Sequence, residues 1–339
     1  MRRTNNRSLT STLTLTMLTH LIRSKGPLNI VRRGRAIVSC VGLTADRMAR
    51  SLAAFVDLLA AYDACATFPV TALTLRRRPA VLRSLLQGPA RVELAVHGYR
   101  HSDMSLLAPS AQAAELTAAA SIFHRERIPF TGFRAPYLRW NASLLTALRG
   151  AGYAYDSSQS ILWPVLDRGW PVGGPPGDSD SHARADLQRL LEFCRPHPAE
   201  TFPSLPFWAD GILEIPVSFP DDEMLIERLR ISDPARIAAI WIASLEQCHA
   251  RGELFVLQLH PERLPLCAEA LAAVLERARG LRPAVWLATL GDVAAWWQAH
   301  GNAAARTDRW PNAAGSALAV TGDIDALTAW DYVWRFLGA

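Results

Sequence analysis

RVELAVHGYRHSD, residues 91–103, leads from an apolar β-type run into two histidines. The run RVELAVH is typical of a buried strand, and His97 is its last residue. His101 follows four residues later, so on a helical turn both imidazoles point the same way and can share one metal ion. An HxxxH pair alone is weak evidence, because such histidines are as often surface or core residues. Its position at a strand end favours a functional site, since parallel barrels place functional side chains there.

Around this stretch the chain alternates β-type runs with helical patterns, which is typical of βα units on a parallel sheet. The expected strands are residues 36–40 (AIVSC), 66–70 (ATFPV), 91–97, 153–156, 212–217, 254–260, 285–290 and 317–325. The expected helices are residues 45–62, 109–125, 141–151, 234–250, 266–279 and 330–338. Residues 163–182 and 195–209 are irregular and rich in Pro or Gly, so we expect lid or binding loops there.

The composition is that of an ordinary globular protein with one large core. The chain has 339 residues, of which 50% are hydrophobic and 20% charged. Its net charge of +5 sits partly in short basic clusters such as residues 76–78. No cluster is interleaved with aromatic residues as a nucleic-acid groove requires, which argues against a nucleic-acid partner. The clusters fit a solvated surface, or loose attraction to an anionic glycan or lipid surface.

The cysteines and the N-terminal region bear on the compartment. Five scattered cysteines without a CxxC pair argue against a disulfide framework and against a cysteine zinc site. Residues 8–22 are a poor signal-peptide core, and no run approaches the roughly 18 apolar residues of a spanning helix. We expect residues 1–35 to form a poorly ordered or peripheral lead-in. The expected location is cytoplasmic, with peripheral contact to the inner membrane face as an option, and the oligomeric state is left open.

Two further segments put reactive side chains where strands should end. GFRAPYLRWN (132–141) contains Arg134, and LQLHPER (257–263) contains His260. The alternative interpretation of residues 132–141 is a tight turn with Arg134 in a surface ion pair. The alternative interpretation of His260 is a structural role.

The segment GDID (322–325) ends the expected strand at 317–325 with two carboxylates. Asp323 and Asp325 are two residues apart, so strand alternation points both to the same side. Two carboxylates on one side repel unless a metal ion or an arginine neutralises one of them.

Together these segments resemble the motifs of NodB-type polysaccharide deacetylases, carbohydrate esterase family 4. HGYRH (97–101) resembles the two-histidine metal motif, FRAPY (133–137) the Arg-x-Pro-Tyr motif and LQLHP (257–261) the terminal Leu-His motif. YDSSQSILW (155–163) and EIPVSFPDD (214–222) also fit. The order and spacing agree over about residues 45–300. The resemblance implies an α/β fold, a distorted (β/α) barrel of the NodB type, as a single domain over residues 36–339.

The chain departs from the family in one place. The family opens with a strand that ends in an Asp-x-Asp or Asp-Asp pair, whereas VSCVGLT (38–44) has Cys40, Val41 and Gly42 there. VTGDIDALT (320–328) resembles the missing motif, moved to the end of the chain. Because a barrel is cyclic, either terminus can supply its first strand. We therefore expect a circularly permuted barrel in which residues 315–339 supply this strand; the alternative is a pseudoenzyme with AIVSC in that slot.

The resemblance implies roles for individual residues. The metal ligands would be His97, His101 and Asp325, a set that suits zinc best, with cobalt, nickel or manganese as alternatives. The implied catalytic residues are Asp323 as general base, Arg134 as its partner, the backbone N–H of Tyr137 at the oxyanion and His260 as general acid. The implied substrate-binding residues are Leu259, which would line an acetyl pocket, with Trp140, Asp156 and Trp163.

The expected function is metal-dependent removal of an N-acetyl or other small N-acyl group from a glycan or a glycan precursor. Alternatives within the same chemistry are a deformylase acting on a lipid-linked amino sugar and a ring amidase of the allantoinase-like branch. An alternative from another class is a catalytically inactive carbohydrate-binding protein. Aromatic residues near the irregular segments fit either sugar stacking or lid packing: Trp140, Trp163, Trp170, Phe207 and Trp208.

Overall fold

The computed structural model describes residues 41–166, 178–300 and 309–332. Two compact units are distinguished, one of Ser51–Asp325 and one of Met1–Arg50 with Ala326–Ala339. All of the sheet and all of the candidate site residues lie in the first unit. The expected lead-in at 1–35 and the expected strand at 36–40 lie outside the described residues. Of the expected C-terminal helix, residues 330–332 are described and helical.

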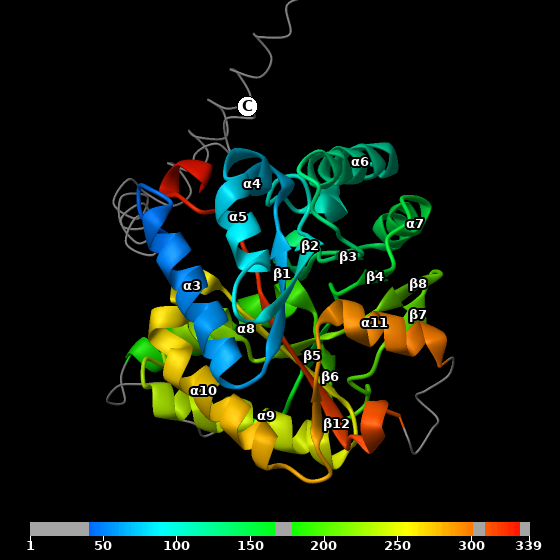
Figure 1. Cartoon of the computed structure of the whole chain (residues 1–339). Coiled ribbons are helices and arrows are strands. Elements are labelled where there is room, and N and C mark those ends of the chain that lie inside the picture. Colours follow the sequence, from blue (N-terminus) through cyan, green and yellow to red (C-terminus); the bar gives the residue numbers. More distant parts are fainter. Residues whose placement is uncertain (1–40, 167–177, 301–308, 333–339) are drawn as a thin grey trace, which may run out of the picture. The chain divides into compact units, whose positions relative to one another are not determined.

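One sheet organises the unit Ser51–Asp325 (Figure 1). Its strand order is β6-β5-β9-β10-β12-β1-β2-β3-β4-β8-β7, and β11 pairs with β12 off this path. Every described pair is parallel except β7 with β8, which gives a curled, mostly parallel half-barrel. The strands are β1 (Cys65–Val70), β2 (Arg91–Val96), β3 (Gly132–Phe133), β4 (Tyr155–Asp156), β5 (Ser160–Leu162), β6 (His197–Pro198), β7 (Phe207–Ala209), β8 (Ile212–Glu214), β9 (Val217–Phe219), β10 (Leu254–Leu259), β11 (Val285–Leu287) and β12 (Ser316–Gly322).

Helices connect the strands, as the alternating pattern predicted. The described helices are α3 (Asp46–Ala61), α4 (Ala72–Arg77), α5 (Pro79–Leu86), α6 (Pro109–Arg125), α7 (Ala142–Gly150), α8 (Asp178–Cys194), α9 (Pro234–Ala250), α10 (Leu264–Gly280) and α11 (Leu290–Ala299). Prolines occupy the first turn of α6 and α9, where the missing N–H leaves no helical hydrogen bond unmade. In the part of the chain that the structure describes, no helix has the length and apolarity to cross a bilayer.

Strand β12 comes last in the chain but lies in the middle of the sheet. It pairs with β10 over six of its seven residues, from Ala317 opposite Leu254 to Gly322 opposite Leu259. On its other side it pairs with β1, with Thr321 opposite Thr67, and a bridge from Val70 to Ile324 follows (Figure 1). All seven residues of β12 are buried, as a parallel strand covered on both faces requires. Asp323 and Asp325 therefore leave the sheet at the same edge as the end of β1.

Two expectations about local structure are wrong, and three of the described helices were not predicted. Residues 212–217 form two strands instead of one, β8 beside β4 and β9 between β5 and β10. Pro216 lies between them, and a proline cannot donate to a strand ladder. Helix α8 begins at Asp178, inside the stretch expected to be irregular, and helices α4, α5 and α11 were not predicted.

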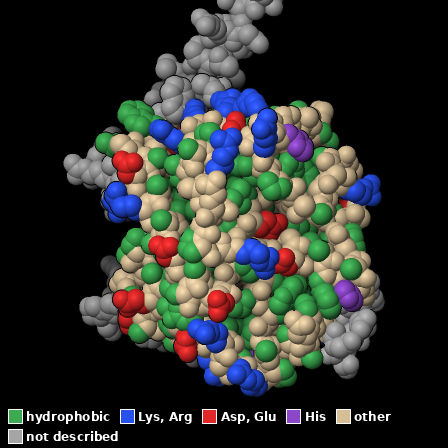
Figure 2. All heavy atoms as spheres, in the orientation of Figure 1, with side chains coloured by type: hydrophobic (Ala, Val, Ile, Leu, Met, Phe, Trp, Pro, Cys, Tyr) green, Lys and Arg blue, Asp and Glu red, His purple; other side chains and the backbone are tan. Residues whose placement is uncertain are grey.

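Charged side chains are mixed over the face shown in Figure 2. Basic side chains gather near α4, whose last turn carries Arg76 and Arg77, and acidic side chains are interspersed with basic ones elsewhere. This distribution is that of a solvated surface, the simpler interpretation of the basic clusters.

Gly132 in β3 allows a close approach that holds the sheet together. A Cβ atom there would lie 1.8 Å from Cζ of Tyr155, far inside van der Waals contact. The Tyr155 hydroxyl donates to Oε1 of Glu93 at 2.9 Å, and Oε2 of Glu93 accepts from the Gly291 N–H at 2.8 Å. Glu93 thereby connects β2 to β4 and to the start of α11.

We expect Gly132→Ala to lower the free energy of unfolding by about 1–3 kcal/mol, because the Tyr155 ring must shift and release Glu93. The measurement is chemical denaturation followed by circular dichroism. Gly150→Ala is the control, since no atom lies within 4 Å of a Cβ there and alanine is the better helix former. Equal stability of the two variants would contradict the tight approach at Gly132.

Candidate metal centre and its acid–base partners

Two histidines and one aspartate converge at the edge of the sheet. His97 follows β2, and its Nε2 lies 3.4 Å from Oδ1 of Asp325. Nε2 of His101 lies 3.1 Å from Oδ2 of the same carboxylate. His97, His101 and Asp325 each offer one potential ligand atom, and these three atoms lie within 4.8 Å of one another. Side-chain exposure is 2% for His97, 8% for His101 and 12% for Asp325, so the cluster is enclosed but reachable.

The surrounding hydrogen bonds orient this cluster for a metal ion. Nδ1 of His97 lies 2.8 Å from the carbonyl oxygen of Arg134, an acceptor, so Nδ1 carries the proton and Nε2 presents a lone pair. The hydroxyls of Thr71 and Thr74 donate to the backbone carbonyl of Asp325 at 3.2 and 3.1 Å. Two imidazole nitrogens and one carboxylate, with remaining positions for water or substrate, are a donor set that fits Zn²⁺.

Asp323 lies beside the cluster and is held by two donors. Arg134 donates to its Oδ1 at 2.7 Å, and Gln258 donates to its Oδ2 at 3.0 Å. Oδ2 is 3.9 Å from Nε2 of His97. Arg134 is fully buried and Asp323 is 2% exposed, so their charges compensate each other away from water.

His260 follows β10 and is held by Asp222, a residue to which the sequence analysis gave no role. Its Nδ1 lies 2.7 Å from Oδ1 of Asp222, and its backbone N–H donates to Oδ2 at 2.7 Å. Burial is the largest single effect and lowers the pKa of His260, but the charge and the hydrogen bond of Asp222, together with the charge of Glu262, raise the pKa well above its usual value. Asp222 directly follows Asp221 at the end of β9, next to the strand that carries His260. Asp222 can be identified as the partner of His260 only once β9 and β10 are known to be neighbours in the sheet. The linear sequence does not contain that information.

Tyr137 lies in a strained turn next to His101. It has a left-handed φ of 61° within the turn Pro136–Leu138, and its ring is 4.2 Å from that of His101. The ring is 46% exposed. Strain of this kind in a non-glycine residue persists where the surrounding structure imposes it, which is common at functional sites.

Phe193 in α8 extends this aromatic surface and was not predicted. Its ring centroid is 6.3 Å from that of Tyr137, and it is 41% exposed. Arg139 fixes this end of α8 by donating to the Phe193 carbonyl at 2.9 Å, and its guanidinium lies 4.8 Å from the ring centroid. Tyr137 and Phe193 thus present aromatic surface beside the histidines.

Two of the predicted substrate-binding residues are buried. Trp163 is 1% exposed, and the guanidinium of Arg251 lies 5.1 Å from its ring, so its face is covered by protein. Asp156 is fully buried, and its Oδ1 accepts from the Ser157 N–H and the Ser158 hydroxyl, so this oxygen is engaged within its own segment.

The other residues predicted to contact substrate differ in their exposure. Leu259 is buried at the end of β10, next to His260, and Trp140 is half-buried. Phe207 packs against Phe202, and Trp208 is 56% exposed on β7, the edge strand. Trp170 lies outside the described residues.

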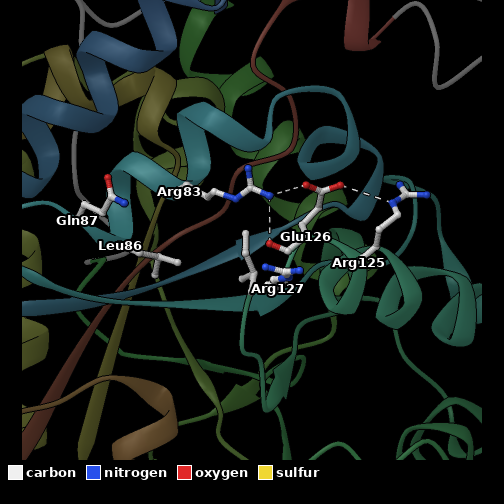
Figure 3. Close-up of a pocket in the computed structure, with 7 residues that line it drawn as sticks. Arg83, Leu86, Gln87, Arg125, Glu126 and Arg127 are labelled. Atoms are coloured by element: carbon white, nitrogen blue, oxygen red, sulfur yellow. Dashed lines mark hydrogen bonds and ion pairs between the residues drawn. The ribbon is translucent and has the colours of Figure 1, made fainter.

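A surface hollow elsewhere in the molecule contains none of these residues (Figure 3). It lies between α5 and the end of α6, where Arg83 donates to the Glu126 carboxylate at 2.7 Å. Arg83 also donates to the Glu126 carbonyl at 3.2 Å. These bonds join two helices, and the hollow has no part in the metal centre.

Comparison with known proteins agrees with this geometry. Residues 34–155 match the family model described as polysaccharide deacetylase. A protein described as a polysaccharide deacetylase from Mycobacterium smegmatis has a TM-score of 0.54 and 20% identity over 85% of this chain and 86% of its own. One from Pseudomonas aeruginosa has a TM-score of 0.55 and 15% identity, over 74% of this chain and 73% of its own. Puue allantoinase has a TM-score of 0.55 and 17% identity, over 74% and 72%.

No curated protein matches the chain. The resemblance to polysaccharide deacetylases drawn from the sequence motifs is confirmed by the family match, and the fold is of the NodB type.

We expect a pH titration of the His260 ring by NMR to give a pKa well above the usual histidine value, and Asp222→Asn to lower it. Without the charge of Asp222, the main contribution that opposes burial is lost, and burial lowers the pKa of the imidazolium. The raised pKa stabilises the fold fully below about pH 6.5, and this stabilisation is lost as pH rises through the folded pKa. An unchanged His260 pKa in Asp222→Asn would exclude Asp222 as its partner.

Proposed function

We propose that this protein is a metal-dependent hydrolase that removes an N-acetyl or other small N-acyl group from a glycan or a lipid-linked sugar precursor. The observation that carries the proposal is the convergence of three metal-ligand side chains on one point beside a buried carboxylate held by arginine. An ionised carboxylate and a paired histidine supply the base and the acid that amide hydrolysis requires.

His97, His101 and Asp325 would hold the ion, and zinc suits their donor set best. When bound, the ion supplies Lewis-acid activation of the attacking water and of the amide carbonyl. The remaining steps fall to side chains and backbone groups of the chain itself.

Asp323 is the proposed general base. Arg134 and Gln258 occupy one lone pair on each carboxylate oxygen and hold the group in one orientation. The remaining lone pairs can take the proton of the attacking water, whose oxygen forms the new bond to the acyl carbon.

His260 is the proposed general acid. Asp222 accepts from Nδ1–H and keeps the imidazolium form, so Nε2–H is the proton available for donation. When the C–N bond breaks, the leaving nitrogen takes this proton and departs as a neutral amine. The backbone N–H of Tyr137 is the proposed donor to the oxyanion, and Leu259 the proposed wall of the acyl pocket.

We also propose that the barrel is circularly permuted relative to the family. The support is that the Asp-x-Asp segment follows β12, which lies between β10 and β1 although it comes last in the chain. Its aspartates lie beside the histidines that follow β2. This arrangement argues for a complete site and against the pseudoenzyme alternative, in which Cys40 and Gly42 would occupy the place of the carboxylates.

The metal site is tested with two aspartate variants that differ in role. Asp325→Asn should lose both metal and activity, because a neutral amide is a far weaker ligand. Asp323→Asn should keep the metal and lose activity, because an amide cannot act as a base. Metal content by mass spectrometry and acetate release from N-acetylated oligosaccharides are the measurements. Allantoin is tested in parallel; its hydrolysis in place of acetate release would overturn the proposed substrate class.

His260→Ala completes this set. It should bind metal normally and lose about 10²–10⁴-fold in kcat, the usual contribution of a general acid. Full turnover by this variant would remove His260 from the mechanism, and loss of metal would make it a ligand.

Phe193→Ala tests the aromatic surface as a sugar subsite. We expect KM for an N-acetylated oligosaccharide to rise about 2–10-fold, the equivalent of one aromatic contact, with kcat for a small aryl acetate unchanged. Trp208→Ala is the matched control, since Trp208 is also an exposed aromatic residue, 56% exposed against 41% for Phe193, but lies on the edge strand. An equal rise of KM in both variants would contradict a subsite at Phe193.

A further inference from the structure

Two carboxyl groups that the proposed chemistry does not use are buried side by side in the sheet. Asp156 in β4 and Glu214 in β8 are register partners, and both are completely inaccessible to solvent. Two carboxylates in contact inside a protein repel strongly and lack hydration, so the stable state of such a pair keeps one proton.

The hydrogen bonds of the pair determine which oxygens face each other. Oδ1 of Asp156 accepts from the Ser157 N–H at 2.9 Å and from the Ser158 hydroxyl at 2.5 Å. Oε1 of Glu214 accepts from the N–H groups of Ser158 and Gln159 at 3.0 and 2.9 Å. The second oxygens, Oδ2 and Oε2, are buried, and no other group among the described residues bonds to them. They are left for a hydrogen bond between the two carboxyl groups.

Glu214 is the member that keeps the proton. Burial, followed by the negative charge of Asp156, raises the pKa of Glu214 well above its usual value. Burial also raises the pKa of Asp156, to about 6, but hydrogen bonds from Ser158 and Glu214 oppose the rise. Glu214 therefore donates, and Asp156 accepts.

The segment held by this pair is the one that holds Arg134. Nε of Arg134 donates to the Ser157 carbonyl and Nη2 to the Ser157 hydroxyl, both at 3.0 Å. The Ser158 hydroxyl oxygen accepts from the Ala135 N–H at 2.8 Å. The third nitrogen, Nη1, reaches Asp323 and Thr321 at 2.7 and 2.8 Å. An unbroken series of hydrogen bonds thus leads from the carboxyl pair to the carboxylate of Asp323.

We propose that Asp156 and Glu214 form a carboxyl pair sharing a single proton, and that this pair positions Arg134 against Asp323. Both are positioning residues and touch no substrate. The kinetic consequence rests on the proposed function, because only there is Asp323 the base. The shared proton itself does not depend on it.

Amide substitutions test the shared proton. In Glu214→Gln the amide nitrogen replaces the protonated oxygen, so the variant should unfold close to the wild-type temperature. In Asp156→Asn the amide donates to an ionised Glu214, and the decrease in unfolding temperature should again be small. In the double variant both NH₂ groups face each other, because both carbonyl oxygens are bound to N–H or O–H donors.

The double variant should therefore lose at least about 1.5 °C more in Tm than the two single losses combined, the equivalent of about 1 kcal/mol for a chain of this length. Additive losses would overturn the shared proton. This measurement needs no activity, so it remains decisive if the wild type fails to release acetate.

The positioning role is tested by kinetics and by rescue. Glu214→Leu leaves the N–H groups of Ser158 and Gln159 without an acceptor, and should lower kcat about 10-fold or more with KM and zinc content unchanged, since small displacements of catalytic groups are costly. Glu214→Gln should restore kcat to within about twofold of wild type, since it restores the hydrogen bonds. Wild-type kcat in a folded Glu214→Leu variant would overturn positioning, as would a failure of Glu214→Gln to restore it.

Discussion

The buried ion pair between Arg134 and Asp323 is the interaction on which the rest of the site depends. Neither group has appreciable contact with water, and removing one partner of such a pair typically costs about 3–5 kcal/mol. Arg134 follows β3 and Asp323 follows β12, so the pair joins two strands that are far apart both in the chain and in the sheet. A position of the β12 end in which this carboxylate missed this guanidinium would leave a buried charge uncompensated. The same position brings Asp325 to the histidines.

A parallel sheet suits this arrangement because the carboxyl ends of its strands share one edge. In the spatial order β10, β12, β1 and β2, that edge carries His260, the aspartate pair, Thr71 and His97. The groups proposed to act on protons are each oriented by a partner from another strand. Asp222 after β9 holds His260, and Arg134 after β3 holds Asp323. Reactive groups held in this way need little reorganisation during a reaction, which is the physical basis of preorganised catalysis.

Burial separates the motif residues that lie at the proposed site from those that are enclosed by protein. Asp156 and Trp163 belong to a segment that resembles the family, yet both are enclosed by protein. A motif records which residues recur together, and residues recur for structural reasons as well as for contact with substrate. Asp156 is such a case, since it supports the turn that holds Arg134. Phe193 is the opposite case. It lies in a helix without any motif, and only the contact between α8 and Tyr137 brings it near the histidines.

The sequence by itself determined the alternation of strands and helices, the placement of histidines, arginine and aspartates at strand ends, and the family they resemble. These features are local, because hydrophobic periodicity and turn residues act over a few positions. Only the tertiary structure decided that β12 lies between β10 and β1, that residues 212–217 divide between two neighbours, and that Asp222 holds His260. Each of these is a pairing between segments distant in the chain, and it is set by which buried surfaces and charges can be satisfied together.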